Sequence, residues 1–198
     1  MKKIPASVLL VFLSLCIYGQ ASIRLYNQGV KWAQKGNYEK AEAFFTKAIG
    51  LNPLLTEAWF NRALARSKSG RYRDAISDYT KAIGIRPGFA MAYNNRGCDR
   101  NELKDFTGAL EDYTKAIEQD SGYARAWYNR GVVKTELEEY ASAINDFLRV
   151  IRLDPGFAGV RENTIQARTA LLKKTIAGFA VHYLLDNTYA GIPLNFLR

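Results

Sequence analysis

Hydrophobic and small side chains recur along the chain with a fixed period, and the recurrence passes through four consecutive units. Within each unit the apolar positions lie three or four residues apart, which is the spacing of one face of an α-helix. Each unit has two such stretches with a turn between them. The pattern therefore predicts an all-α chain in which every unit folds as a pair of helices.

Eight columns of this internal alignment keep their register through the four units. The first helix of each pair carries three of them: Leu25, Trp59, Tyr93 and Trp127; Asn27, Asn61, Asn95 and Asn129; Gly29, Ala63, Gly97 and Gly131. The second helix carries the others, which begin with Tyr38, Tyr72, Phe106 and Tyr140 and continue with Ala41, Phe45, Ala48, Ile49 and their equivalents. Small residues let two antiparallel helices approach closely, and the aromatic side chains fill the spaces between neighbouring pairs.

Turn and stop signals lie where the helix pairs require them. The turn between the helices carries glycine in the first two units, Gly36 and Gly70, and a charged residue in the other two, Lys104 and Glu138. Proline cannot continue a helix, and it lies just past the second helix in three units, at Pro53, Pro87 and Pro155. The turn geometry of the last two units is the part of this pattern that the sequence leaves open.

This organisation resembles the tetratricopeptide repeat family, whose unit is a 34-residue helix–turn–helix. The resemblance covers residues 22–157 as four repeats, 22–55, 56–89, 90–123 and 124–157, and the best match runs from Glu57 to Pro87. It implies an α-solenoid, a right-handed superhelix of stacked helix pairs whose concave surface is lined by the first helix of each pair. It also implies a scaffold that binds proteins or peptides and catalyses no reaction.

One departure from the family pattern predicts its own partner. Arginine stands where the family usually has leucine, at Arg62, Arg96 and Arg130, and an aspartate follows later in the same repeat, at Asp78, Asp112 and Asp146. The first repeat lacks both, with Gln28 and Phe44 in their places. We therefore expect an Arg–Asp pair inside repeats two to four. A second basic column, Arg66, Arg100 and Lys134, either shares these acids or forms a solvated basic strip.

The family resemblance places the candidate binding residues on the first helices. It implies that Asn27, Asn61, Asn95 and Asn129 point into the concave groove, where an amide can both donate to and accept from an extended peptide. The alternative is that these amides bond within the protein. Three aromatic neighbours, Tyr26, Phe60 and Tyr128, would offer flat apolar anchors, and Arg125 lies on the adjoining face. The column of Val30, Leu64, Cys98 and Val132 either lines the groove or packs between repeats.

The N-terminal segment, residues 1–21, is typical of a secretory signal peptide. Lys2 and Lys3 precede the apolar run Ala6–Ile17, which is shorter than a membrane span, and small residues follow it. We expect cleavage after Gly19 or Ala21 and a periplasmic or secreted protein. A retained anchor and lipidation at Cys16 are the alternatives.

The C-terminal segment, residues 158–198, is expected to cap the solenoid. The part 158–174 is predicted as a polar capping helix, 175–187 as a short packing helix, and 188–198 as an apolar tail. A sharper hypothesis is that this tail enters a neighbouring groove and forms a homodimer. His182 lies in the packing helix, where a partly buried ring is the simpler interpretation and a hydrolase site the alternative.

Composition narrows the functional classes. The chain of 198 residues has one histidine and two cysteines, which excludes a His-rich or multi-Cys metal centre, and it shows no phosphate-binding loop. Cys98, the one thiol that remains after cleavage, is expected to be buried. We therefore expect a non-catalytic adaptor of the bacterial envelope without a cofactor. An adaptor for wall-processing enzymes and a self-associating structural protein are the alternatives. The net charge of +9 favours an anionic envelope surface as a further partner, while the lack of a base-reading motif disfavours nucleic acid.

Overall fold

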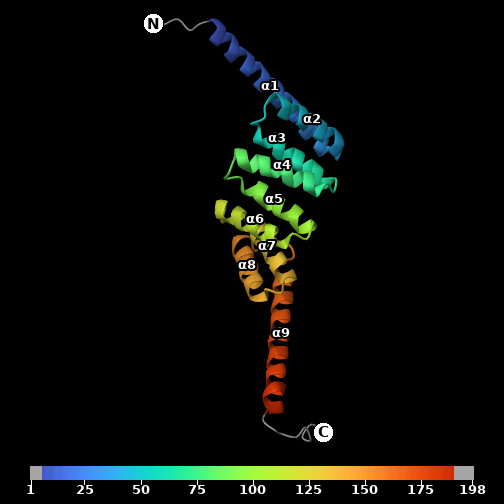
Figure 1. The fold of residues 1–198 in the computed structure, drawn as a ribbon, viewed down its shortest axis with the longest axis vertical. Coiled ribbons are helices and arrows are strands. Elements are labelled where there is room, and N and C mark those ends of the chain that lie inside the picture. The colour runs from blue at the N-terminus through green and yellow to red at the C-terminus, as the bar shows by residue number, and fades with distance from the viewer. Residues whose placement is uncertain (1–5, 190–198) are drawn as a thin grey trace, which may run out of the picture. The chain divides into compact units, whose positions relative to one another are not determined.

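The computed structural model describes residues 6–189, with side chains for residues 19–179. This part of the chain is entirely helical outside its turns, which confirms the predicted all-α solenoid (Figure 1). The helices in chain order are α1 (Ala6–Gln34), α2 (Tyr38–Leu51), α3 (Thr56–Lys68), α4 (Tyr72–Ile85), α5 (Ala90–Glu102), α6 (Phe106–Gln119), α7 (Ala124–Glu136), α8 (Tyr140–Leu153) and α9 (Val160–Tyr189).

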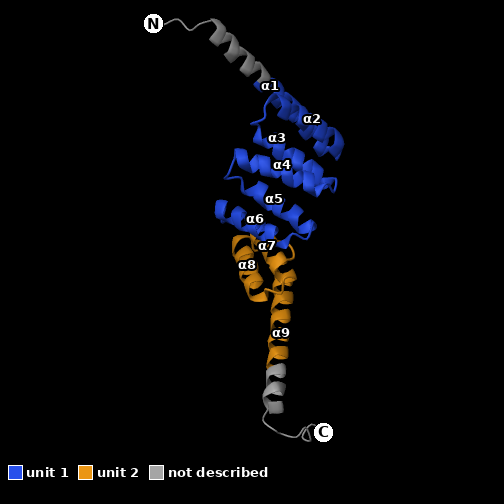
Figure 2. Cartoon of the chain, viewed as in Figure 1, with its two compact units in different colours: residues 1–126 blue, residues 127–198 orange. Residues whose placement is uncertain are grey.

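The helices repeat with the period of the sequence. The helices α3, α5 and α7 begin at Thr56, Ala90 and Ala124, at equal intervals of one repeat. The second helices repeat in the same way from Tyr38 onward. The chain divides into two compact units, residues 1–126 and 127–198, which we describe separately (Figure 2).

The same left-handed turn joins the two helices in every repeat. Gly36 and Gly70 have φ angles of 74° and 75°, and Lys104 and Glu138 have 63° and 59°. A side chain in this region of φ is uncommon and carries strain because its Cβ crowds the backbone. The turn geometry that the sequence left open is therefore retained in repeats three and four without glycine.

Each repeat is built around one buried aromatic ring on its second helix. Phe45, Tyr79, Tyr113 and Phe147 have almost no solvent exposure. The first helix approaches the ring through a small residue: a Cβ on Gly97 would lie 2.8 Å from the ring of Tyr113. Contacts this short do not occur between real side chains, so packing requires glycine at this position in repeat three, while repeat two accommodates Ala63 there.

The C-terminal region differs from the expected pair of helices. The helix α9 runs without interruption from Val160 to Tyr189, where we predicted a capping helix and a separate packing helix. Residues 171–177 contain neither glycine nor proline, so nothing in this stretch stops the helix. Of the predicted tail, 188–198, the first two residues belong to α9, and residues 190–198 lie outside the described residues.

The N-terminal region is also one continuous helix. Residues 6–21 of the segment predicted to be cleaved and the first helix of repeat one join within α1. Among the described helices, none combines the length and apolar character needed to cross a membrane.

Candidate functional site

A buried ion pair fixes the two helices of repeat two to each other. The Nε and Nη2 atoms of Arg62 donate to the two carboxylate oxygens of Asp78, both at 2.8 Å. The Arg62 guanidinium also lies 4.8 Å from the ring centre of Trp59 on the preceding turn of α3. Two parallel hydrogen bonds and a stacked ring set the direction of this side chain, because the guanidinium is planar.

The same pair recurs in repeats three and four. Arg96 donates twice to Asp112 at 2.9 and 2.6 Å, and Arg130 donates twice to Asp146 at 2.9 and 2.8 Å. The predicted Arg–Asp pairs are therefore confirmed in all three repeats.

The second basic column shares the same aspartates. Arg66, Arg100 and Lys134 lie 2.8, 3.1 and 2.9 Å from the carboxylates of Asp78, Asp112 and Asp146. Of the two alternatives for this column, the structure shows sharing. These three cations are paired with aspartates inside the repeats, so they contribute to the scaffold and do not form a separate basic strip.

The asparagine column contains amides that link one repeat to the next. The Nδ2 atom of Asn61 donates to the hydroxyl of Tyr26 at 2.9 Å and to the carbonyl of Glu57 at 3.0 Å. The same bond recurs in the C-terminal unit, where Asn163 donates to the hydroxyl of Tyr128 at 3.0 Å. Within the described residues no donor bonds to the side-chain oxygen of Asn61, which can therefore accept a hydrogen bond from a ligand.

The aromatic candidates pack against the repeat cores along one side of each ring. Tyr26 lies 5.8 Å from Phe45, Phe60 lies 4.8 Å from Phe89, and Tyr128 lies 4.9 Å from Phe157, measured between ring centres. All three side chains are half-buried, so each is anchored and presents only part of its surface. Burial raises the pKa of Tyr26, and the nearby Glu57 carboxylate raises it further, so the hydroxyl stays neutral.

An apolar pocket lies where α1, α2 and α3 meet in the N-terminal unit. It has a volume of about 280 Å³. The lining residues are Val30, Ala33, Gln34, Tyr38, Asn61, Leu64, Ala65 and Lys68. Its wall is apolar at Val30 and Leu64, and amide groups and one ammonium group lie among the lining residues. Such a combination suits an apolar side chain of a ligand, oriented by a few polar contacts.

The pocket brings together only some of the predicted candidates. Asn61 lines it, and Tyr26 is hydrogen-bonded to Asn61 beside it. Asn27 and Arg125 are exposed outside the pocket lining, while Asn95 and Asn129 are half-buried. The side-chain amide of Asn94 donates to the Oδ1 atom of Asn95 at 3.1 Å.

The polar pocket residues Gln34 and Lys68 escaped the sequence-based reasoning. The sequence identified Val30 and Leu64 as members of one column, but it did not decide whether this column lines the groove or packs between repeats. Their recurrence with the period of the repeats was the signal for a shared surface.

A buried carboxylate in α5 was also missed. Asp99 is only 2% exposed, and the Ser67 hydroxyl donates to its Oδ1 atom at 2.6 Å, while its Oδ2 atom has no hydrogen-bond partner within the described part of the chain. Burial raises the pKa of Asp99 to about 6, although the Ser67 bond opposes this shift. The equivalent positions in repeats two and four hold the buried residues Ala65 and Val133, whereas repeat one has the exposed Lys31 there.

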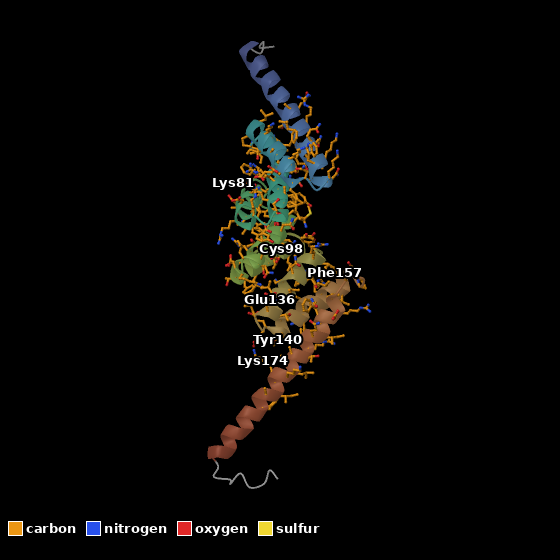
Figure 3. The ribbon with its side chains drawn as sticks, turned by 90° about the vertical axis from the view of Figure 1, so that its right-hand side faces the viewer. Lys81, Cys98, Glu136, Tyr140, Phe157 and Lys174 are labelled. Atoms are coloured by element: carbon orange, nitrogen blue, oxygen red, sulfur yellow. The ribbon has the colours of Figure 1, made fainter. Side chains whose placement is uncertain are left out.

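The neighbouring thiol is half-buried, whereas a buried thiol was expected. Burial raises the pKa of Cys98 (Figure 3), which keeps the group in its neutral form. Within the described residues no three His, Cys, Asp or Glu side chains gather as a metal site would require. The side chain of His182 lies outside the described side chains.

Comparisons with known proteins agree with this architecture. Models of the tetratricopeptide repeat match residues 25–53, 56–89 and 124–157. The uncharacterized protein MJ0572 of Methanocaldococcus jannaschii is 55% identical over 40 residues, which are 20% of this chain and 46% of that protein. The chain thus spans about half the length of this curated relative.

Similar solved structures carry the same type of solenoid. A crystal structure of MamA protein superposes with a TM-score of 0.73 at 23% identity, covering 84% of this chain and 89% of MamA. The first tetratricopeptide repeat domain of Spaghetti (RPAP3), bound to the HSP90 peptide SRMEEVD, superposes with a TM-score of 0.58 at 26% identity. The match covers 59% of this chain and 93% of that domain. The OM64 domain of Arabidopsis superposes with a TM-score of 0.56 at 29% identity, covering 58% of this chain and 94% of that domain. With four helix pairs in a common register and repeat models matched in three of them, the chain belongs to the tetratricopeptide repeat family.

Proposed function

We propose that this protein is a non-catalytic scaffold that binds a partner protein through an extended peptide segment. The observation that carries the proposal is the apolar pocket between α1 and α3, which is lined by Val30 and Leu64 and bordered by the amide of Asn61. The solved structure of the Spaghetti domain with its HSP90 peptide supports the same use of this fold. The pocket holds an apolar side chain of the ligand, while the side-chain oxygen of Asn61 accepts a hydrogen bond from the peptide backbone.

The pocket can be tested by filling it. Leu64→Arg places a long charged side chain at the pocket wall, and Leu54→Arg makes the same change at a residue that is 74% exposed and outside the pocket. Peptides are selected from a random display library against the full chain, and their affinities for both variants are measured by fluorescence anisotropy. We expect Leu64→Arg to weaken binding at least tenfold and Leu54→Arg to leave it unchanged.

The opposite results would reject this site. Equal affinity for both variants, with both folded by circular dichroism, would place the peptide elsewhere on the chain. Failure to select any peptide against the unchanged chain would count against peptide binding itself.

The same proposal includes export to the bacterial envelope. Its support is the N-terminal sequence, in which two lysines precede a short apolar run. All the pocket residues of α1 lie after the expected cleavage sites, so a processed chain keeps the groove. The mass of the protein recovered from a periplasmic extract tests this directly: loss of the segment that ends at Gly19 or at Ala21 supports export with cleavage. Full-length protein confined to the cytoplasm would exclude it.

A further inference from the structure

The helix α9 begins as the first helix of a fifth repeat. Val160 is fully buried, as are Ala58 and Ala92 at the same repeat position, and Asn163 bonds Tyr128 as Asn61 bonds Tyr26. Thr164 and Ala167 are buried on the same side, and α9 packs against α8. One face of α9 is therefore covered by the repeat that precedes it.

A second face of α9 carries an exposed apolar seam. Ile165, Leu172, Ile176 and Phe179 are 63, 63, 66 and 71% exposed. With Thr169 they follow the 4–3–4–3 spacing of residues that pack against another helix. At 100° per residue, the seam lies roughly 120° around the helix from the face that contacts α8. The helix thus has one partner and an uncovered seam for a second.

The preceding repeats show what covers this position. Ile165 occupies the column of Ala63, Gly97 and Gly131. Ala63 packs in the cluster around Tyr79, and Gly131 lies directly against the ring of Phe147. In these repeats the covering element is the second helix of the pair. Ile165 therefore continues this series of helix–helix contacts, and Leu172, Ile176 and Phe179 extend the seam beyond the point at which the first helix ends in the preceding repeat. A seam of this form fits a helix.

The charged residues beside the seam indicate which kind of helix would pack on it. Arg168 and Lys173 lie on opposite edges of the seam, and neither has an acidic partner within the described residues. Glu162 is the one acidic residue between Val160 and Phe179, and it contacts Gln166. Lys174, on another face, pairs with Glu138 and lies near Tyr140 (Figure 3). From Thr169 to Phe179 the seam is therefore bordered by positive charge, and Glu162 lies beside its N-terminal end.

These borders argue against two other occupants. An antiparallel second copy centred on Leu172 would bring Lys173 close to its own equivalent, and like charges there oppose pairing. A lipid surface favours a broad apolar face, whereas this seam spans roughly 60° of the helix and has charged side chains directly beside it. A narrow seam with basic edges is complementary to a helix with acidic edges.

We propose that α9 docks an amphipathic helix of a partner protein, whose apolar seam packs on Ile165, Leu172, Ile176 and Phe179 and whose flanking positions are Asp or Glu. At Ile165 the docked helix takes the place that the second helix holds in each repeat, and from there it follows α9 as far as Phe179. This surface is separate from the pocket between α1 and α3, so it does not depend on the function proposed above.

The probe is a pair of labelled helical peptides, each three heptads long with leucine at the seam positions, one with Glu and the other with Lys at the flanking positions. Binding to the full chain is measured by fluorescence anisotropy at low salt. We expect the acidic peptide to bind at least tenfold more tightly than the basic one. The double variant Arg168→Glu/Lys173→Glu should reverse this preference, because only the edge charges change.

A matched pair of variants tests the seam itself. Leu172→Asp should weaken binding of the acidic peptide at least tenfold, and Leu54→Asp, at an exposed leucine far from α9 in the sequence, should leave it unchanged. Both side chains are exposed, so both variants should keep the wild-type helix content.

Several results would overturn the proposal. Equal binding of the two peptides, or binding of neither, would show that the seam does not select an acidic helix. A wild-type dimer that Leu172→Asp dissociates, seen by sedimentation, would assign the seam to a second copy. Binding to phosphatidylglycerol vesicles but to neither peptide would assign it to a lipid surface. Binding that appears only after residues 190–198 are removed would assign it to the chain's own terminus.

Discussion

Repeats one and two have different types of side chain at two equivalent positions. In repeat two, Arg62 and Asp78 form a buried, doubly hydrogen-bonded pair, whereas repeat one has Gln28 and Phe44 there. Repeat one still takes part in the network, because its Glu42 accepts a hydrogen bond from Arg66 at 2.9 Å, and Arg66 also binds Asp78. The ion pair is therefore one of two solutions for joining the helices. Its presence in three repeats makes those repeats sensitive to the loss of a single partner.

The largest expected effect comes from breaking the pair on one side. Asp78→Asn keeps the shape of the side chain but leaves the buried charge of Arg62 without its counter-ion, and we expect a loss of about 3–5 kcal/mol in the free energy of unfolding. The double variant Arg62→Gln/Asp78→Phe installs the residues of repeat one and should recover most of that loss. Urea denaturation measures both, and a double variant less stable than Asp78→Asn would contradict the comparison.

The next effect compares Asp99 in repeat three with its buried apolar equivalents. The folded-state pKa of about 6 lies above the ordinary value of 3.8, so folding favours the protonated carboxyl. Stabilisation from this proton is complete below pH 3.8 and is lost as the pH rises through 6. Asp99→Asn should therefore be more stable than wild type by about 1–3 kcal/mol at pH 7.5, since one pKa unit corresponds to about 1.4 kcal/mol.

Unfolding curves at several pH values give the measurement. The advantage of Asp99→Asn should shrink steadily between pH 7 and pH 4, because other titrating groups are common to both chains. A difference that stays constant with pH would show that Asp99 does not titrate in this range.

The turns give a smaller effect. Gly70 and Lys104 occupy the same left-handed position in repeats two and three. Gly70→Lys should cost about 1 kcal/mol, because a side chain strains this conformation, and Lys104→Gly should gain up to about the same amount. Thermal or urea unfolding of the two reciprocal variants is sufficient. Changes of the same sign would contradict the interpretation.

The smallest effect concerns the start of the second helices. The Asn37 side chain accepts a hydrogen bond from the backbone N–H of Lys40 at 3.0 Å, whereas Arg71, its equivalent in repeat two, makes no such bond. Asn37→Ala should cost about 0.5–1 kcal/mol through loss of the cap. Arg71→Ala serves as the control for the backbone, although it also removes the contact with Glu42. A smaller loss for Asn37→Ala than for Arg71→Ala would show that the cap contributes less than that ion pair.

The helix pairs and the Arg–Asp pairs could be predicted from the sequence alone, because the two members of each pair belong to the same repeat. Arg62 and Asp78 belong to the same repeat, and the two partners are absent together from repeat one, so the internal alignment exposes their relation. The bond between Asn61 and Tyr26 instead joins two repeats and two different columns. An amide that suits a peptide backbone equally suits a tyrosine hydroxyl, so the residue types could not decide between them.

The ends of the chain were harder to predict for a different reason. Repetition supplies an internal standard for residues 22–157 and for the start of α9, and the remaining segments have none. We predicted a separate packing helix over 175–187, but helix α9 continues because residues 171–177 contain neither glycine nor proline. Asp99 was missed because its column also holds the charged Lys31, so the residue types there did not indicate that the position is buried.

The spacing of the helices has a consequence for how this protein can change over generations. Because α3, α5 and α7 begin at equal intervals, duplication or deletion of one whole repeat in the gene would rejoin matching surfaces. Helices contact mainly their neighbours in sequence, so no distant interface would have to be rebuilt. A lineage could thereby lengthen or shorten its binding surface in single genetic steps, while an insertion of another size inside a helix would move its buried residues out of register.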